Sequence, residues 1–238
     1  MSRDVDDWAA VHACLAKADA LLLDFDGPVC SVFSGFPAYT VADQLRDTLI
    51  QGGHRPLPIE VRQSPDPFEV LYYAATLGEE ETRYVEAAFT AHECEAIQTA
   101  QPTPGAHHFI RTWHNSGRPL AIVSNNSRAA IETYISLHNL GAQVTAVAAR
   151  DFIDLSHLKP SPYLLVEALA RMKVEADNAV FLGDSATDIQ AGRGAGVKCI
   201  AFANRPHKVD SLGRLTRITI TRFPLAGPYW VESRYEVE

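Results

Sequence analysis

The sequence lacks several features that would assign it to a specialised class of protein. Its four cysteines are scattered among 238 residues and form no Cys-x-x-Cys pair, which argues against a zinc site or a disulfide scaffold. No apolar run approaches the roughly 20 residues that a membrane helix needs. The acidic N-terminus is not followed by a long apolar stretch, so neither a signal peptide nor a transit peptide is expected. These absences predict a cytoplasmic protein that binds no membrane.

Positive charge is also scarce. The chain has 21 lysines and arginines against 29 aspartates and glutamates, which gives a net charge of −8. Broad attraction to nucleic acid or to an anionic membrane is therefore not expected. An anionic substrate would need local positive charge or a metal ion. The balance favours a small soluble metabolite over a polymer, and the oligomeric state stays open.

What the sequence does contain is an alternation of short apolar runs and helical patterns. Hydrophobic residues make up 47% of the chain and charged residues 21%, as in ordinary globular proteins. Continuous apolar runs are typical of strands buried on both faces of a parallel sheet. We therefore predict an α/β fold with a Rossmann-like, doubly wound parallel sheet, whose ligands bind at the carboxyl ends of the strands. The predicted strands are 20–25, 119–123, 143–148, 179–182, 198–202 and 216–221, and the predicted helices are 104–115, 127–140, 160–173 and 185–195.

One long segment interrupts this alternation. Residues 31–102 contain amphipathic helical patterns at 38–51, 67–77 and 79–97, separated by a Pro- and Gly-rich stretch at 52–67. We interpret the segment as a smaller α-helical cap domain, inserted into a core made of residues 1–30 and 103–238. Because it directly follows the first strand, it is placed to cover a site at that strand's end.

Two carboxylates end the first apolar run. Asp24 and Asp26 follow Ala20–Leu23 and are followed by Gly27, which permits a tight turn. Carboxylates at the tip of a buried strand must be offset by a cation, hydrogen bonds or a reaction. Asp24 is a candidate nucleophile toward phosphorus, and Asp26 a candidate acid and base for the leaving oxygen and for water. Taken alone, the same string also fits a simple turn and helix cap.

Two further polar residues, Ser124 and Lys159, are candidates for the same site. Ser124 follows an apolar run and precedes Asn125, so its hydroxyl and nearby backbone N–H groups are candidates to hold a phosphoryl oxygen. Lys159 precedes Pro160, and its ammonium is a candidate to neutralise a nucleophile and a transferring phosphoryl group. Each is weak alone, since such a serine is often a helix cap and a lone lysine is often solvated.

A second carboxylate pair follows the run at 179–182. Asp184 and Asp188 are four residues apart, so both point the same way if the chain becomes helical at once. Such oxygens suit Mg²⁺, which takes few protein ligands and keeps several waters. A capped helix start, with Asp184 or Ser185 as the cap, explains this string equally well.

The order of these motifs resembles that of the haloacid dehalogenase superfamily of phosphohydrolases. Asp24 to Gly27 resembles its first motif, Ser124 the second, Lys159 with Pro160 the third, and Gly183-Asp184 with Asp188 the fourth. The stretches 188–197 and 203–206 are similar to the phosphoglycolate-phosphatase-like branch, and the resemblance covers about residues 20–206. It implies a helical cap, an aspartyl-phosphate mechanism, and Mg²⁺ held by Asp24, the backbone carbonyl of Asp26 and Asp184, with Asp188 holding the metal site together directly or through water.

Two parts of the chain depart from the family pattern. Pro28-Val29 stands where the family usually has Thr-Leu or Val-Leu, which removes a backbone donor near the first motif. Residues 207–238 carry no family motif, and we expect their aromatics to pack against an edge of the fold. These aromatics are Phe223, Tyr229, Trp230 and Tyr235.

The resulting hypothesis is a Mg²⁺-dependent phosphatase that hydrolyses a small phosphomonoester. Asp24, Asp26, Ser124 and Lys159 are the predicted catalytic residues, and Ser124, Asn125, Lys159 and Gly27 the predicted phosphate-binding residues. Asp24, Asp26, Asp184 and Asp188 are the predicted metal residues. A phosphomutase would use the same core but require a bisphosphate activator, and a non-catalytic module that keeps the fold would turn over no substrate. Asp26 argues against a haloacid dehalogenase, which lacks the second aspartate of the first motif.

Overall fold

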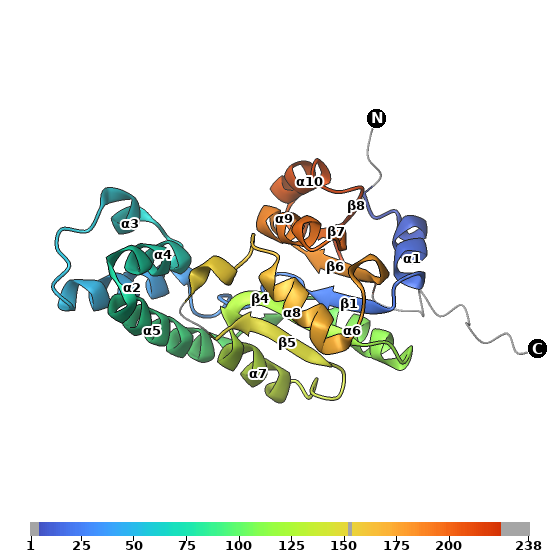
Figure 1. Ribbon diagram of the computed structural model, residues 1–238, viewed down its shortest axis with the longest axis horizontal. Coiled ribbons are helices and arrows are strands. Elements are labelled where there is room, and N and C mark those ends of the chain that lie inside the picture. Colours follow the sequence, from blue (N-terminus) through green and yellow to red (C-terminus); the bar gives the residue numbers. More distant parts are fainter. Residues whose placement is uncertain (1–4, 152–153, 225–238) are drawn as a thin grey trace, which may run out of the picture.

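The computed structural model describes residues 5–151 and 154–224. Within that part of the chain, a parallel sheet has the strand order β5-β4-β1-β6-β7-β8 (Figure 1). This arrangement confirms the predicted doubly wound α/β fold. The strands are β1 (Ala20–Leu23), β4 (Leu120–Ser127), β5 (Ala146–Arg150), β6 (Ala179–Gly183), β7 (Lys198–Phe202) and β8 (Ile218–Ile220).

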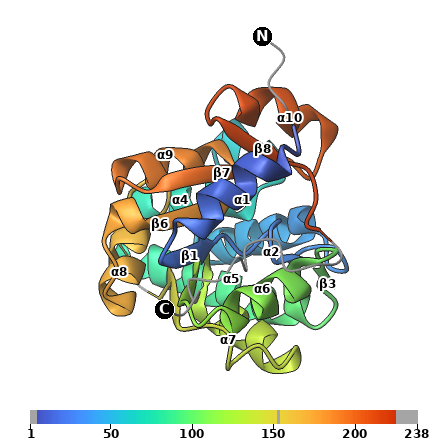
Figure 2. The ribbon, with the colours of Figure 1, turned by 90° about the vertical axis from the view of Figure 1, so that its right-hand side faces the viewer.

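Helices cover both faces of this sheet, so its central strands are buried on both sides. Leu21 and Leu23 of β1 pack in one cluster with α1 and α6, whereas Ala20 and Leu22 pack in another with α8. Figure 2 shows α8 and α9 on the opposite side of the strands from α6 and α7. Burial on both faces explains why β1 is apolar at every position. The helices are α1 (Trp8–Ala16), α6 (Ala106–Asn115), α7 (Arg128–Leu137), α8 (Tyr163–Met172), α9 (Ala186–Gly194) and α10 (Pro206–Gly213).

A helical segment, comprising α2 to α5, stands to one side of the sheet (Figure 1). It leaves the core after β2 (Cys30–Ser31) and returns at β3 (Gln101–Pro102), and these two short strands pair antiparallel. The segment has its own hydrophobic cluster, in which Val41, Leu45, Leu71 and Phe89 are buried. Its helices are α2 (Ala38–Gln51), α3 (Ile59–Gln63), α4 (Pro67–Leu77) and α5 (Glu79–Ile97).

The predicted helices agree with the structure best where the amphipathic pattern continues over many residues. The helices predicted at 38–51, 67–77 and 79–97 have those bounds in the structure. Ser127 caps α7, since its side chain accepts a hydrogen bond from the backbone N–H of Ala130.

Other bounds were predicted wrongly. Pro160 does not lie in the first turn of a helix, because α8 begins only at Tyr163. The strand predicted at 143–148 lies at Ala146–Arg150, because its register follows the pairing with β4. Pattern reasoning missed α1, α3 and α10; α3 lies inside the stretch at 52–67 that was predicted to separate helices.

The end of the described chain packs against the core. Phe223 is buried and its ring lies 4.8 Å from that of Phe109 and 4.9 Å from that of Phe202, centroid to centroid. Packing of Phe223 is therefore confirmed, whereas Tyr229, Trp230 and Tyr235 lie outside the described residues. None of the helices in the described part is both long and apolar enough to span a membrane.

Candidate active site

Three adjacent strands bring the predicted residues together at one edge of the sheet. β1 lies between β4 and β6, and Asp24 follows β1, Ser124 lies in β4, and Asp184 follows β6. Parallel strands place their carboxyl ends at the same edge. These residues, with Asp26, Asn125, Lys159 and Asp188, line one cavity of about 330 Å³.

Lys159 connects two of the carboxylates. Its Nζ lies 2.6 Å from Oδ1 of Asp24 and 2.6 Å from Oδ1 of Asp188, and it donates a hydrogen bond to the carbonyl of Val123 at 3.1 Å. Burial by itself disfavours the ammonium, but the negative charges of Asp188 and Asp24 outweigh it and raise the pKa of Lys159. The lysine is therefore a fixed positive charge in the site and not a solvated surface residue.

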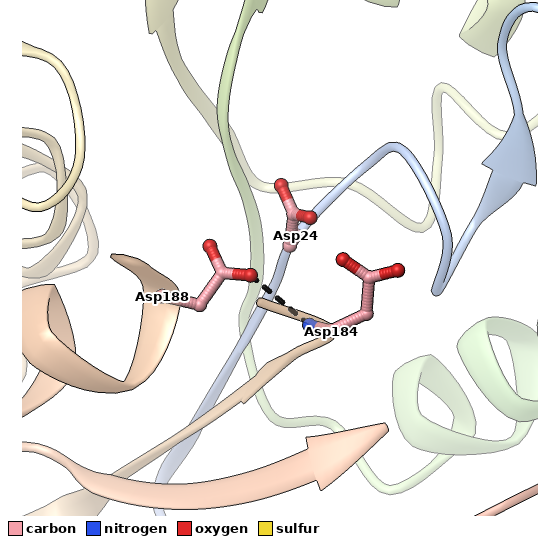
Figure 3. Close-up of side chains that lie close together, drawn as sticks. All are labelled: Asp24, Asp184 and Asp188. Atoms are coloured by element: carbon pink, nitrogen blue, oxygen red, sulfur yellow. Dashed lines mark hydrogen bonds between the residues drawn. The ribbon is translucent and has the colours of Figure 1, made fainter. Parts of the chain in front are cut away.

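Asp24, Asp184 and Asp188 form a compact acidic cluster (Figure 3). One carboxylate oxygen from each lies within 4.8 Å of the others. Oδ2 of Asp188 accepts hydrogen bonds from the backbone N–H groups of Asp184, at 3.0 Å, and Ser185, at 2.9 Å. Ser185 also caps α9, whose first turn contains Asp188. The predicted helix cap and the predicted acidic site thus occur together, because the capped turn holds Asp188 beside Asp184.

The acidic cluster has more negative than positive charge, and burial raises the pKa of two of its carboxylates. Desolvation, followed by the charge of Asp188, raises the pKa of Asp24 to about 8, although Lys159 opposes the shift. Desolvation also raises the pKa of Asp184. The four carboxylates of Asp24, Asp26, Asp184 and Asp188 face the ammonium groups of Lys159 and Lys208, which leaves a formal deficit of two positive charges. A divalent cation with a preference for oxygen ligands fits this donor set.

Lys208, which sequence reasoning missed, forms an ion pair with Asp184. Its Nζ contacts Oδ2 of that carboxylate, and Lys208 lies in the first turn of α10. The preceding stretch at 203–206 was noted only as part of a family resemblance. A lysine two residues beyond it carried no pattern of its own, so only the packing of α10 reveals the contact.

Asp26 and Gly27 form the turn after β1. Oδ1 of Asp26 accepts a hydrogen bond from the backbone N–H of Val32 at 2.9 Å, and burial raises the pKa of Asp26 to about 6. Gly27 has a φ of +110°, and a Cβ at this position would collide with the carboxylate of Asp184. Its N–H donates to the carbonyl of Cys30 at 2.7 Å. Gly27 is therefore needed for the turn and for the close approach of Asp184, while its phosphate-binding role stays a prediction.

Ser124 and Asn125 lie beside Lys159. The Ser124 hydroxyl donates to Oδ1 of Asn126 at 3.1 Å, and Ser124 is buried within the cavity wall. The side chain of Asn125 holds the backbone of Lys159, accepting from its N–H at 2.8 Å and donating to its carbonyl at 3.1 Å. Asn125 thus fixes the loop that carries the lysine, a contact that its sequence position did not suggest.

A buried ion pair, also missed by sequence reasoning, supports the end of β4, which contains Asn125. Nη2 of Arg150, at the end of β5, lies 2.6 Å from Oε2 of Glu93 on α5, and both side chains are fully buried. Glu93 also accepts from the side chain of Asn126 at 2.8 Å and from the N–H of Ser127 at 2.9 Å. Arg150 donates to the carbonyl of Asn125 at 2.8 Å. The pair therefore ties the helical segment to the end of β4.

Comparison with protein families gives one match over most of the chain. A family model for haloacid dehalogenase-like hydrolases matches residues 18–196. The match confirms the resemblance inferred from the four motifs.

Curated relatives match shorter stretches. The bifunctional riboflavin kinase/FMN phosphatase of Arabidopsis thaliana is 37% identical over 103 residues, which are 43% of this chain and 27% of that protein. Phosphoglycolate phosphatase 1 of Pseudomonas aeruginosa is 26% identical over 126 residues, 53% of this chain and 46% of that protein. Pyrophosphatase PpaX of Halalkalibacterium halodurans is 30% identical over 98 residues, 41% of this chain and 45% of that protein. The chain spans less than half the length of each of these relatives.

Solved structures share the fold. A hydrolase from Pseudomonas syringae superposes with a TM-score of 0.63 at 15% identity, covering 87% of this chain and 94% of that one. A HAD family hydrolase from Deinococcus radiodurans, solved with bound phosphate and sodium, has a TM-score of 0.54 at 22% identity and covers 87% of this chain and 92% of that one. At these identities the likeness concerns the fold alone.

Proposed function

Since this chain belongs to the haloacid dehalogenase-like hydrolase family, we propose that it is a Mg²⁺-dependent phosphatase that hydrolyses a small phosphomonoester through an aspartyl-phosphate. The observation that carries the proposal is the position of Lys159, whose ammonium lies 2.6 Å from both Asp24 and Asp188. A buried carboxylate beside a fixed ammonium, at the mouth of a cavity, suits attack on an anionic phosphoryl group.

The metal would be held by Asp24, Asp184 and the backbone carbonyl of Asp26, with Asp188 supporting the site. Two observations support this assignment: the oxygens of Asp24, Asp184 and Asp188 lie within 4.8 Å of one another, and these three carboxylates together with that of Asp26 exceed the two ammonium groups by two charges. When bound, Mg²⁺ would offset the charge of the phosphoryl oxygens and orient the phosphoryl group toward the nucleophile.

Each side chain would then have a separate role in the reaction. Asp24 attacks phosphorus with a carboxylate oxygen while Asp26 gives its proton to the leaving alcohol oxygen. Asp26, now a carboxylate, takes a proton from water as that water attacks the aspartyl-phosphate and releases inorganic phosphate. Lys159 holds Asp24 in place and faces the charge that develops on the phosphoryl oxygens. The Ser124 hydroxyl, which lines the same cavity, is a further donor for those oxygens.

The helical segment would act as the cap predicted for residues 31–102. Its helix α4 contributes residues to the wall of the cavity that contains Asp24. A wall supplied by a separate helical layer can exclude water from the phosphoryl group once substrate is bound.

The proposal is tested by hydrolysis of p-nitrophenyl phosphate with and without Mg²⁺. We expect turnover to need the metal, and Asp24→Asn to lower kcat by about 10³-fold or more because the amide is a poor nucleophile. Asp210→Asn, an exposed aspartate on α10, is the matched control and should keep full activity. Equal kcat for Asp24→Asn and the unmodified protein would overturn the mechanism, with thermal unfolding showing that both are folded.

A further inference from the structure

The cavity that contains the candidate catalytic residues has a second wall with a different chemistry. This α4 wall consists of Asp66, Phe68, Glu69 and Tyr72, which lie at the start of α4 or just before it. A volume of about 330 Å³ accommodates a small ligand. With the phosphoryl group beside Asp24, the alcohol part of the substrate would contact the α4 wall.

The α4 wall presents negative charge and aromatic surface. Asp66, Glu69 and Tyr72 are spaced three residues apart, which puts them on one face of the helix. Asp66 is the N-cap, and its Oδ1 accepts a hydrogen bond from the backbone N–H of Phe68 at 2.9 Å. Burial, followed by the charges of Asp66 and Glu69, raises the pKa of Tyr72, so its hydroxyl stays protonated at neutral pH. The wall therefore offers two carboxylates, a hydroxyl and aromatic faces.

The basic groups near the α4 wall already form ion pairs with other carboxylates. Among the described residues that line the cavity, Lys159 is the basic one, and it is paired with Asp24 and Asp188. The guanidinium of Arg150 lies over the ring of Phe68, 5.5 Å from its centroid, but it is buried against Glu93. Throughout the described chain, no basic side chain lies within ion-pair distance of Asp66 or Glu69. A second anionic group on the substrate would therefore face two carboxylates without a cation.

From this arrangement we propose that the site selects phosphate esters of amino alcohols, whose protonated amine contacts Asp66 and Glu69, and excludes esters that carry a second anionic group. The inference rests on the proposed phosphatase function and specifies its substrate class. Opposite charges attract the ammonium, and the rings of Phe68 and Tyr72 add a surface that a cation favours. The carboxylates of Asp66 and Glu69 repel a carboxylate or a second phosphate on the substrate, so repulsion adds to the specificity.

The test compares three small esters that differ in the charge of the alcohol part. We expect kcat/KM to fall from phosphoethanolamine to glycerol phosphate to phosphoglycolate, by about tenfold at each step, because the carboxylates are solvent-exposed and partly screened. The preference should weaken as salt is raised. Asp66→Asn with Glu69→Gln should reduce the range to within about threefold, and Asn retains the helix cap. Glu80→Gln, an exposed cap glutamate that lines a different cavity, is the matched control and should change nothing.

A binding measurement separates this inference from the proposed function. Asp24→Asn protein, with Mg²⁺ present, is titrated calorimetrically with the same three esters. Tighter binding of phosphoethanolamine than of phosphoglycolate supports the charge selection even if no ester is turned over, a result that would count against the phosphatase alone. Turnover of p-nitrophenyl phosphate combined with equal or better use of phosphoglycolate would overturn the charge selection and leave the phosphatase intact.

Discussion

The two walls of the cavity differ in how firmly their polar groups are held. On the core wall, Asp24, Lys159 and Asp188 are buried, and each makes at least one short polar contact within the group. On the α4 wall, Asp66 and Glu69 are exposed and belong to a separate helical layer. Fixed buried charges suit a reaction whose geometry cannot vary, whereas exposed charges on one helix face can change without disturbing it. Under the proposed function, chemistry and selectivity would therefore be built on different parts of the chain.

The walls are not independent, because ion pairs of Arg150 with Glu86 and Glu93 join the helical segment to the core. Glu93 lies on α5 of the helical segment, while Arg150 and the end of β4 at 124–127 belong to the core. A buried pair costs desolvation, and removing one partner leaves an uncompensated charge. This junction is therefore the most vulnerable point of the arrangement.

Of the three substitutions, Glu93→Gln is expected to have the largest effect on stability and activity. The amide NH₂ would face the donors of Arg150 or Ser127, so we expect the free energy of unfolding to fall by about 3 kcal/mol. Because the end of β4 after Ser124 loses its support, kcat should fall as well. Urea unfolding and p-nitrophenyl phosphate turnover measure the two effects. Glu95→Gln, an exposed glutamate on the same helix, is the control, and equal stability of the two variants would contradict a structural role for the Glu93–Arg150 pair.

Lys208→Met tests the contribution of the Lys208–Asp184 ion pair to the proposed metal site. The ammonium of Lys208 pairs with Oδ2 of Asp184, so the proposed Mg²⁺ would compete with it for that carboxylate. Removing the ammonium should tighten Mg²⁺ binding by about three- to tenfold, a change measured by calorimetry with the metal alone. Lys198→Met, an exposed lysine whose Nζ donates to the carbonyl of Asp177, serves as control. Weaker Mg²⁺ binding in Lys208→Met would show that the lysine supports the metal site.

The smallest expected effect is a change in the pH dependence of stability, and it concerns His107, which does not line the cavity. Burial, followed by the charge of His138, lowers the pKa of His107 to about 4, and its Nε2 lies 2.8 Å from the Tyr134 hydroxyl. The folded pKa is below the unfolded value of 6.5, so the unfolded chain binds more protons between those values and stability falls as pH falls through that window. His107→Gln should reduce the loss of Tm between pH 7 and pH 5 by about two degrees. An unchanged slope, or the same change in the exposed His108→Gln, would contradict this.

Sequence patterns predicted the parts of the site that follow strands. Asp24, Ser124 and Asp184 each end or follow an apolar run, and runs buried on both faces determine a parallel sheet whose ends converge. The long amphipathic helices were predicted for the same reason, since a hydrophobic stripe specifies which face is buried. Arg150 and Glu93 could not be found in this way, because a charged residue carries no periodic signal that names its partner in another element.

The order of the motifs, the sheet and the identity of the acidic and basic groups follow from the sequence, because they depend on local hydrophobic pattern and residue type. Tertiary packing decides which carboxylate each ammonium contacts, that Lys208 faces Asp184, and that α4 contributes residues to the wall of the cavity. Those pairings join residues up to 135 positions apart, as with Asp24 and Lys159, and charges at such separations meet only when the whole chain packs.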